Sequence, residues 1–118
     1  MKEKVQRKNS NDIIVEEFSL EDGQKVGKRT IWSDSGVKII EDTFVKGKLN
    51  GPAKQWYGSG VFSVEANFVE GEFDGPYVSF WENGEIKEKG NYREGKKVGK
   101  YIWYKENGEV WSEHQFDE

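Results

Sequence analysis

The sequence predicts an all-β protein, a single-layer, curved and twisted antiparallel sheet of stacked β-hairpins with little or no helix. Glycines recur every 24 residues in three columns, with no insertion or deletion between copies. Large aromatic residues recur at the same step in two further columns. No stretch of useful length shows the periodicity of an amphipathic helix, so repeated strands are the structure to expect.

The five columns stay in register over four copies of the unit. The glycine columns are Gly23, Gly47, Gly71 and Gly95, then Gly27, Gly51, Gly75 and Gly99, then Gly36, Gly60, Gly84 and Gly108. The aromatic columns are Trp32, Trp56, Phe80 and Tyr104, then Phe44, Phe68, Tyr92 and Phe116. Such a pattern indicates one array, in which each unit buries its apolar side chains only against its neighbours.

The repeat also sets the domain organisation. We expect residues 1–10 to form a flexible N-terminal lead-in, because they are polar and lack periodicity. Residues 11–118 then form a single repeat domain. It begins with a degenerate cap strand at residues 11–20, since terminal repeats are usually atypical. Four 24-residue units follow, starting near residues 22, 46, 70 and 94.

Each unit is predicted to be one β-hairpin. In the third unit, residues 76–81 form the first strand and residues 85–92 the second. We expect type I′ turns at Asn83-Gly84 and Asn107-Gly108, because both central residues of that turn need a positive φ. The connection between hairpins contains two glycines four residues apart, which indicates a bulge or tight bend that redirects the next strand.

Strict alternation along the strands predicts one buried face and one open face. The buried face carries both aromatic columns together with Val78, Ile86 and Ile102, and small residues at Ala66 and Gly90 leave room for the rings. The open face is polar but also carries many rings. They are Tyr57, Tyr77, Trp81, Tyr101, Trp103 and Trp111. These rings either stabilise the sheet as cross-strand pairs or mark a contact surface for a partner.

Charge and composition exclude several classes of function. The net charge of the 118-residue chain is −4, and because residues 1–10 carry +3, the remainder carries −7. An acidic body argues against nucleic acid and against anionic membranes, and is compatible with a basic protein partner. There is no cysteine, no secretory signal and no apolar run long enough for a membrane span, so the cytoplasm is the expected location.

The sequence shows no constellation of residues typical of a catalytic site. The single histidine, His114, stands between Glu113 and Gln115 and has no obvious catalytic partner. There is no Gly-x-Ser-x-Gly motif, and the glycine columns lack the Gly-Lys-Ser/Thr ending of a phosphate-binding loop. We therefore predict no enzymatic activity, no cofactor, no metal site and no small-molecule substrate. The 24-residue step also disfavours a choline-binding repeat.

The repeated pattern Gly-x-x-x-Gly-(Pro or Lys), an aromatic residue, a turn glycine and a later Tyr or Phe resembles the MORN repeat. It is most similar to the bacterial variant with an "ENG" turn. Residues 70–92 and 94–116 are good copies, whereas the first full unit departs at Arg29 and Lys38. The resemblance covers about residues 21–118 and implies hairpins stacked side by side. It extends to the YwqK-type antitoxin and immunity family, whose members neutralise a toxin by binding it. MORN repeats also serve many proteins as scaffolds.

The resemblance and the charge together favour a non-enzymatic protein-binding module, an antitoxin or immunity protein that binds and blocks a cognate, basic toxin. The predicted contact residues are Tyr57, Tyr77, Trp81, Tyr101, Trp103 and Trp111, with Glu65, Glu82 and Glu113 steering association. The alternative is a generic scaffold without a toxin partner. Four acidic residues near the C-terminal edge argue against its pairing with another chain, and we expect a monomer or weak dimer. They are Glu109, Glu113, Asp117 and Glu118.

Overall fold

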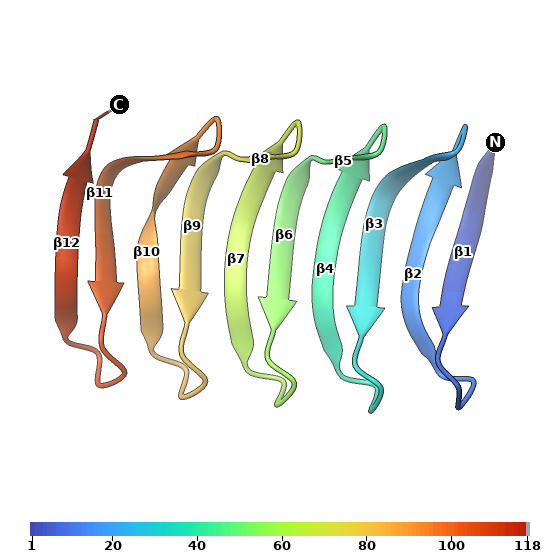
Figure 1. The fold of residues 1–118 in the computed structure, drawn as a ribbon, viewed down its shortest axis with the longest axis horizontal. Helices are drawn as coiled ribbons and strands as arrows, with labels where there is room; N and C mark the ends of the chain where they lie inside the picture. The colour runs from blue at the N-terminus through green and yellow to red at the C-terminus, as the bar shows by residue number, and fades with distance from the viewer. Residues whose placement is uncertain (118) are drawn as a thin grey trace.

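In the structure, a computed structural model that describes residues 1–117, the chain forms one open antiparallel sheet without a helix (Figure 1). The main strands are β1 (Lys2–Lys8), β2 (Ile14–Glu21), β3 (Gln24–Trp32), β4 (Lys38–Val45), β6 (Gly51–Trp56), β7 (Phe62–Val69), β9 (Gly75–Phe80), β10 (Ile86–Arg93), β11 (Lys96–Tyr104) and β12 (Val110–Phe116). They lie side by side in chain order. The short strands β5 (Lys48–Leu49) and β8 (Glu72–Phe73) pair with β4 and β7. The predicted fold class is confirmed.

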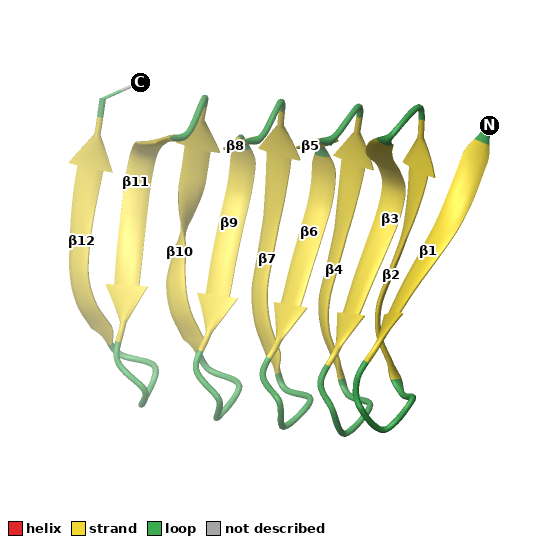
Figure 2. Cartoon of the chain, turned by 45° about the vertical axis from the view of Figure 1, so that its right-hand side comes forward, coloured by secondary structure: helices red, strands yellow, loops and turns green. Residues whose placement is uncertain are grey.

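The sheet is a thin plate with both faces open. It measures 45 × 32 × 14 Å, and its radius of gyration is 16.5 Å. A compact domain of similar size has a radius of gyration of roughly 13 Å. Figure 2 shows curved strands in one layer, with no second layer over either face. Side chains are therefore buried only by their neighbours in the same sheet.

The array contains five hairpins among residues 1–117, one more than the sequence predicts. In the turn between β1 and β2, the Asn9 amide donates to the Ile13 carbonyl (2.9 Å) and the Asp12 amide to the Asn9 carbonyl (3.0 Å). The other four hairpin turns repeat this pattern. The flexible lead-in is thus a wrong prediction for residues 2–8, and β2 is not a cap because β1 pairs with its outer side.

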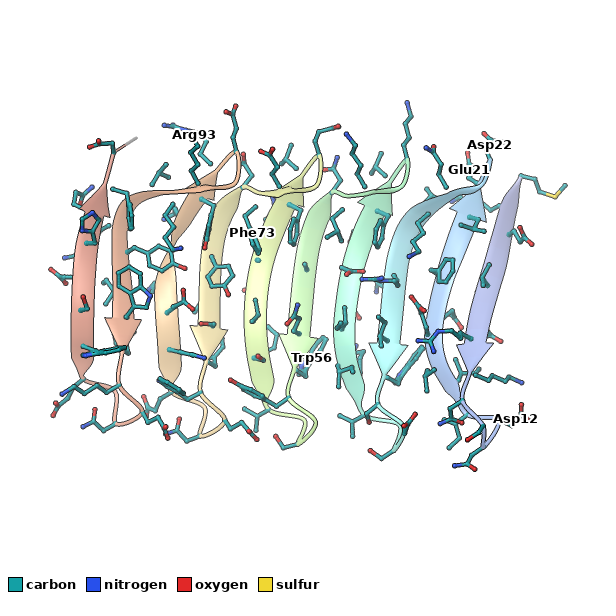
Figure 3. The ribbon with its side chains drawn as sticks, viewed as in Figure 1. Asp12, Glu21, Asp22, Trp56, Phe73 and Arg93 are labelled. Atoms are coloured by element: carbon teal, nitrogen blue, oxygen red, sulfur yellow. The ribbon has the colours of Figure 1, made fainter. Side chains whose placement is uncertain are left out.

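The first copy escaped detection because it lacks the residues that define the period. Asp12 occupies the position of the turn glycine and adopts a φ of 64°, a conformation that Asp tolerates better than most residues. Lys8 occupies the position of the first aromatic column. In Figure 3 Asp12 lies at the edge of the sheet where the five hairpin turns are aligned, and Asp22 lies at the opposite edge.

The turns differ from the prediction at the Asn-Gly positions. Asn83 does not have a positive φ; Gly84 alone does, and the Asn83 side-chain oxygen accepts a hydrogen bond from the Glu85 amide (2.9 Å). These are three-residue loops with a left-handed third residue. Two consecutive residues with positive φ occur instead at the opposite edge of the sheet. They are Asp22-Gly23, Lys46-Gly47, Glu70-Gly71 and Glu94-Gly95. The predicted bend at the second glycine column is confirmed by its positive φ values.

Every hairpin has one extra residue in its second strand, and this bulge decides which face each side chain occupies. In the third full unit, Ile86 pairs with Phe80 but Glu88 pairs with Ser79, so Lys87 is the extra residue. The equivalent residues of the other hairpins are Val15, Ile39, Ser63 and Trp111. Because each bulge reverses the alternation beyond it, the two aromatic columns lie on opposite faces. Their predicted placement on a single buried face is wrong.

We name the faces by their contents. The aromatic face carries the column Phe44, Phe68, Tyr92 and Phe116, and the groove face carries the column Trp32, Trp56, Phe80 and Tyr104. The most deeply buried side chain is on the aromatic face. Tyr101 is 0% exposed, and its ring lies 4.8 Å from that of Trp103 and 6.0 Å from that of Tyr92. Its hydroxyl donates to the Glu88 carboxylate (2.8 Å).

On the aromatic face, the first full unit has charged side chains where later units have aromatic rings. Arg29 donates two hydrogen bonds to the Asp42 carboxylate (2.7 and 3.0 Å) and lies 3.7 Å from that of Glu16. Its guanidinium also lies over the Phe44 ring, 5.0 Å from the centroid. Asp42 is buried, so this bidentate pairing compensates for its desolvation. The departure of Arg29 from the repeat pattern is therefore accommodated by Asp42.

Side chains near the turns join one hairpin to the next. The Tyr57 hydroxyl donates to the Phe80 carbonyl (2.5 Å), and the Trp81 indole N–H donates to the Tyr104 carbonyl (3.3 Å). The Asn83 amide donates to the Glu106 carbonyl (2.7 Å). Donor and acceptor are 23 residues apart in each bond, one fewer than the repeat, so the acceptor directly precedes the donor's equivalent in the next unit. These bonds resist sliding of one hairpin past the next.

Gly90→Ala should destabilise the fold by about 1–3 kcal/mol, because its methyl group would overlap the Tyr101 ring. A Cβ at residue 90 would lie 2.6 Å from Tyr101 Cε2 and 2.8 Å from Cγ. Urea denaturation measures the loss. Gly58→Ala is the matched control, since a Cβ there has no heavy atom within 4 Å. Equal stability of the two variants would show that Tyr101 does not pack on Gly90.

Tyr57→Phe should lower the free energy of unfolding by about 0.5–1.5 kcal/mol, because the Phe80 carbonyl loses its donor. Tyr104→Phe is the control. Within residues 1–117 the backbone carbonyl of Tyr104 accepts a hydrogen bond from a side chain, but its hydroxyl, the group that the substitution removes, takes part in none. Thermal unfolding of both variants measures the difference. A loss of stability in Tyr104→Phe as large as that in Tyr57→Phe would contradict a specific role for the Tyr57 hydroxyl.

Candidate functional site

A groove of about 660 Å³ runs across the groove face over strands β6 to β11. Its apolar lining comes mainly from Val78, Ile86, Ile102 and Tyr104, which are all half-buried. Charged and amide side chains surround these residues, among them Glu65, Lys89 and Asn91. An apolar depression with a few polar groups at its margin is the usual composition of a binding site.

The groove lies where a ladder of ion pairs is interrupted. Lys54 pairs with Glu65 (3.9 Å), and Lys100 pairs with Glu113 (3.7 Å). Glu41 accepts a hydrogen bond from Lys38 (2.9 Å), which, with the nearby lysines, holds the pKa of this carboxyl below its usual value. All three acids belong to one row of cross-strand partners. The row reads Glu41, Lys54, Glu65, Val78, Lys89, Ile102 and Glu113.

The two aliphatic members of that row create the apolar surface. The positions of Val78 and Ile102 are occupied by Thr30 and Lys54 in the first two full units. Lys89 lies between them in the row and, within residues 1–117, has no carboxylate within 4.0 Å. The groove therefore combines an apolar floor with one cation that is available to an incoming carboxylate or carbonyl group.

A strip of rings extends the apolar surface along the same face. The Phe62 ring lies 5.6 Å from both Trp56 and Phe80, and the Lys38 ammonium lies 4.9 Å from the centroid of the Trp56 ring. Phe80 pairs with Ile86, one of the groove residues. In Figure 3 Trp56 lies toward the edge of the hairpin turns, and Phe73 toward the opposite edge. The strip therefore runs beside the turns into the groove.

Three of the six predicted contact rings lie on the aromatic face. Tyr101 is fully buried, so its prediction as a contact residue is wrong. Tyr77 is half-buried and packs edge-to-face on Phe73 and Tyr92 (5.5 Å each), and Trp103 is half-buried against Tyr101. Burial, with the nearby Glu88, raises the pKa of the Tyr77 and Tyr101 hydroxyls, which keeps both neutral at ordinary pH.

The other three rings lie at turns and at the last strand. Tyr57 and Trp81 are half-buried and hold neighbouring hairpins together through their polar atoms. Trp111 is the extra residue of the last bulge and is 70% exposed. Only Trp111, among these six, has the exposure of an uncommitted contact residue. This difference could not be predicted from the repeat pattern, because the same bulge occurs in every hairpin.

The predicted acidic residues are separated from most of those rings. Glu65 and Glu113 lie on the groove face in the ion-pair ladder, and Glu82 is exposed in the loop after β9. Tyr77, Tyr101 and Trp103 occupy the opposite face. The nine predicted residues therefore do not form one surface, and their role in binding remains a prediction for all of them except the buried Tyr101.

Sequence reasoning missed the groove residues because it assigned them to the buried face. One signal was present. The column that contains Val78 and Ile102 has Thr30 and Lys54 in earlier units, and a lysine at a repeat position indicates a position that faces water. Aliphatic residues in such a column are exposed apolar groups and hence candidates for contact.

Residues 1–117 contain no group of three or more histidine, aspartate or glutamate side chains placed to hold a metal ion. In the same range, no buried side-chain nitrogen or oxygen lacks a hydrogen-bond partner. The described residues also include no helix long and apolar enough to cross a membrane.

Comparison with known families agrees with the geometry of the last two hairpins. Residues 73–94 and 97–118 each match the family described as MORN repeat variant. No curated protein matches the chain at a significant level. The two matched segments contain the strands that line most of the groove. The match and the open hairpin sheet together indicate a protein-binding or scaffold module.

Proposed function

We propose that the chain is an antitoxin or immunity protein that binds a cognate toxin through its groove face and blocks the toxin's activity. The observation that carries the proposal is the apolar groove lined by the half-buried residues Val78, Ile86, Ile102 and Tyr104, on a sheet face that no second layer covers. Apolar surface of this kind, rimmed by polar groups, is typical of protein contact sites.

The dimensions of the plate suit a protein partner. A face of 45 × 32 Å exceeds the roughly 800 Å² that one partner buries in a standard complex. The groove supplies an apolar centre, and the Lys–Glu pairs supply the polar rim that such interfaces have. The charge of −7 outside residues 1–10 would accelerate association with a basic toxin.

The groove can be tested with substitutions that the repeat already tolerates. Val78→Thr with Ile102→Thr places at both positions the residue found at Thr30, which keeps the β-branched shape and removes the apolar surface. The double variant should bind the product of the neighbouring gene at least about tenfold more weakly than the unaltered chain, measured by calorimetry.

Ile31→Thr with Val64→Thr is the control, because both residues are half-buried on the aromatic face. It should bind as tightly as the unaltered chain. The same affinity for the groove variant and the unaltered chain, together with a loss in Trp103→Leu, would place the contact on the aromatic face instead. Toxicity assays with co-expression then separate the two functions, because a scaffold would bind the partner without suppressing its activity.

A further inference from the structure

The two outer strands of the sheet carry opposite charge. Strand β1 carries four cations against Glu3, namely Lys2, Lys4, Arg7 and Lys8. Residues 109–117, which contain β12, carry Glu109, Glu113 and Asp117 and neither lysine nor arginine. Figure 1 shows these strands at opposite ends of the sheet, and among residues 1–117 neither has a neighbour on its outer side. Each therefore presents unpaired backbone groups to solvent.

Strand direction allows one end to continue the other. The main path of the sheet has ten strands that alternate in direction, so β1 and β12 run antiparallel (Figure 1). A second copy placed with its β1 beside β12 would keep the alternation and the spacing of the array. The contact would repeat the junction that already joins one hairpin to the next within the chain.

The repeat also fixes the register of such a contact. Within the chain, Glu17 pairs with Thr30 across the junction of β2 and β3, and Glu65 pairs with Val78 across the junction of β7 and β9. Glu113 is the equivalent of Glu17 and Glu65 in the last hairpin, and Gln6 is the equivalent of Thr30 and Val78 in the first. A second copy that continues the repeat therefore places its Gln6 opposite Glu113.

In this register, Lys4 and Lys8 of the second copy are the diagonal neighbours of Glu113. Diagonal neighbours in an antiparallel pair are about 7–8 Å apart, within reach of long side chains. Within the chain Lys4 lies 3.5 Å from Glu17, Lys8 lies 3.4 Å from Asp12, and Glu113 lies 3.7 Å from Lys100. The contact between β12 and β1 would therefore bring these exposed pairs together into one network of opposite charges. A pair of β1 strands would instead join two basic edges, and a pair of β12 strands would join two acidic edges.

The last hairpin also exposes side chains that the earlier hairpins cover. At the bulge position, Val15 is 6% exposed and Ile39 is half-buried, whereas Trp111 is 70% exposed. The residue directly before the bulge is the first residue of the strand. In β10 this residue, Ile86, is half-buried, whereas in β12 it is Val110, which is 51% exposed. In each earlier hairpin the second strand has a further hairpin on its outer side, whereas the second strand of the last hairpin, β12, has none among residues 1–117. The first hairpin of a second copy would supply that cover.

We propose that the chain assembles end to end, with β12 of one copy paired to β1 of a second copy in a continuous sheet. The contact is heterologous, so each addition leaves one basic and one acidic edge free, and further copies can join. This self-association is distinct from partner binding on the groove face. It uses the two outer strands, whereas the groove is lined by residues of β6 to β11.

Sedimentation velocity tests the proposal on the full chain. The sedimentation coefficient should rise with protein concentration at low salt and rise less at high salt, because exposed charges are screened. A chain that stays monomeric at low salt up to its solubility limit would overturn the proposal, and the edge charges would then serve only to keep copies apart.

Charge reversal tests which edges meet. Lys4→Glu with Lys8→Glu makes both edges acidic, and Glu109→Lys with Glu113→Lys makes both edges basic. Each variant alone should associate at least about tenfold more weakly than the unaltered chain, and an equimolar mixture of the two should associate again. Association of either variant alone at the original strength, or no association in the mixture, would contradict the contact.

The repeat supplies matched controls for both reversals. Lys46→Glu with Lys96→Glu uses residues found at the same positions in other units, Glu70 and Glu72. Glu70→Lys with Glu72→Lys makes the opposite change, with Lys46 and Lys48 as precedents. Both controls should assemble like the unaltered chain.

A disulfide maps the register directly, because the chain has no cysteine of its own. In a mixture of Gln6→Cys and Glu113→Cys proteins, oxidation should give mostly the 6–113 heterodimer, since directly opposed residues meet the distance limits of a disulfide. A predominance of 6–6 or 113–113 dimers would show an isologous contact and would overturn the proposed arrangement.

Discussion

Each hairpin of this protein can bury its side chains only against the hairpins beside it, because the sheet has a single layer. The remaining features follow from this constraint. Large rings are used because they reach across neighbouring strands, as Tyr101 does between Tyr92 and Phe116. Hydrogen bonds between residues 23 apart connect the turn regions of successive units. The outermost hairpins lack one neighbour, and Trp111 is exposed for that reason.

The β-bulge turns one repeating strand pattern into two different surfaces. On the aromatic face, rings or the Arg29–Asp42 pair hold successive units together. On the groove face, exposed Lys–Glu pairs alternate with positions that change from unit to unit. Such solvent-exposed pairs add little stability. The residues of the groove face are thus freer to vary without loss of the fold, which suits the role in partner binding that we propose for this face.

The sheet also has ends, and these differ chemically from its faces. A closed barrel would have no free strand, but this open array leaves β1 and β12 with unpaired backbone groups. Proteins usually protect such edges by charge. Here the charges are of opposite sign at the two ends, so the same residues that disfavour pairing of like edges favour pairing of unlike ones. Partner binding on a face and assembly through the ends can therefore occur in the same molecule.

The sequence by itself determined the architecture. The 24-residue step of Gly27, Gly51, Gly75 and Gly99 identified the bends, and the phased rings identified the strands, because both signals are local and repeat without interruption. Only the tertiary structure decided three further points. The one-residue bulges assigned the faces, since a single extra residue reverses the alternation. Pairing with β2 recruited the polar strand β1, whose sequence shows no apolar periodicity. Packing over Gly90 buried Tyr101 and left Val78 and Ile102 half-buried on the open groove face, because burial in a single-layer sheet depends on which strands are adjacent and on which face a side chain lies.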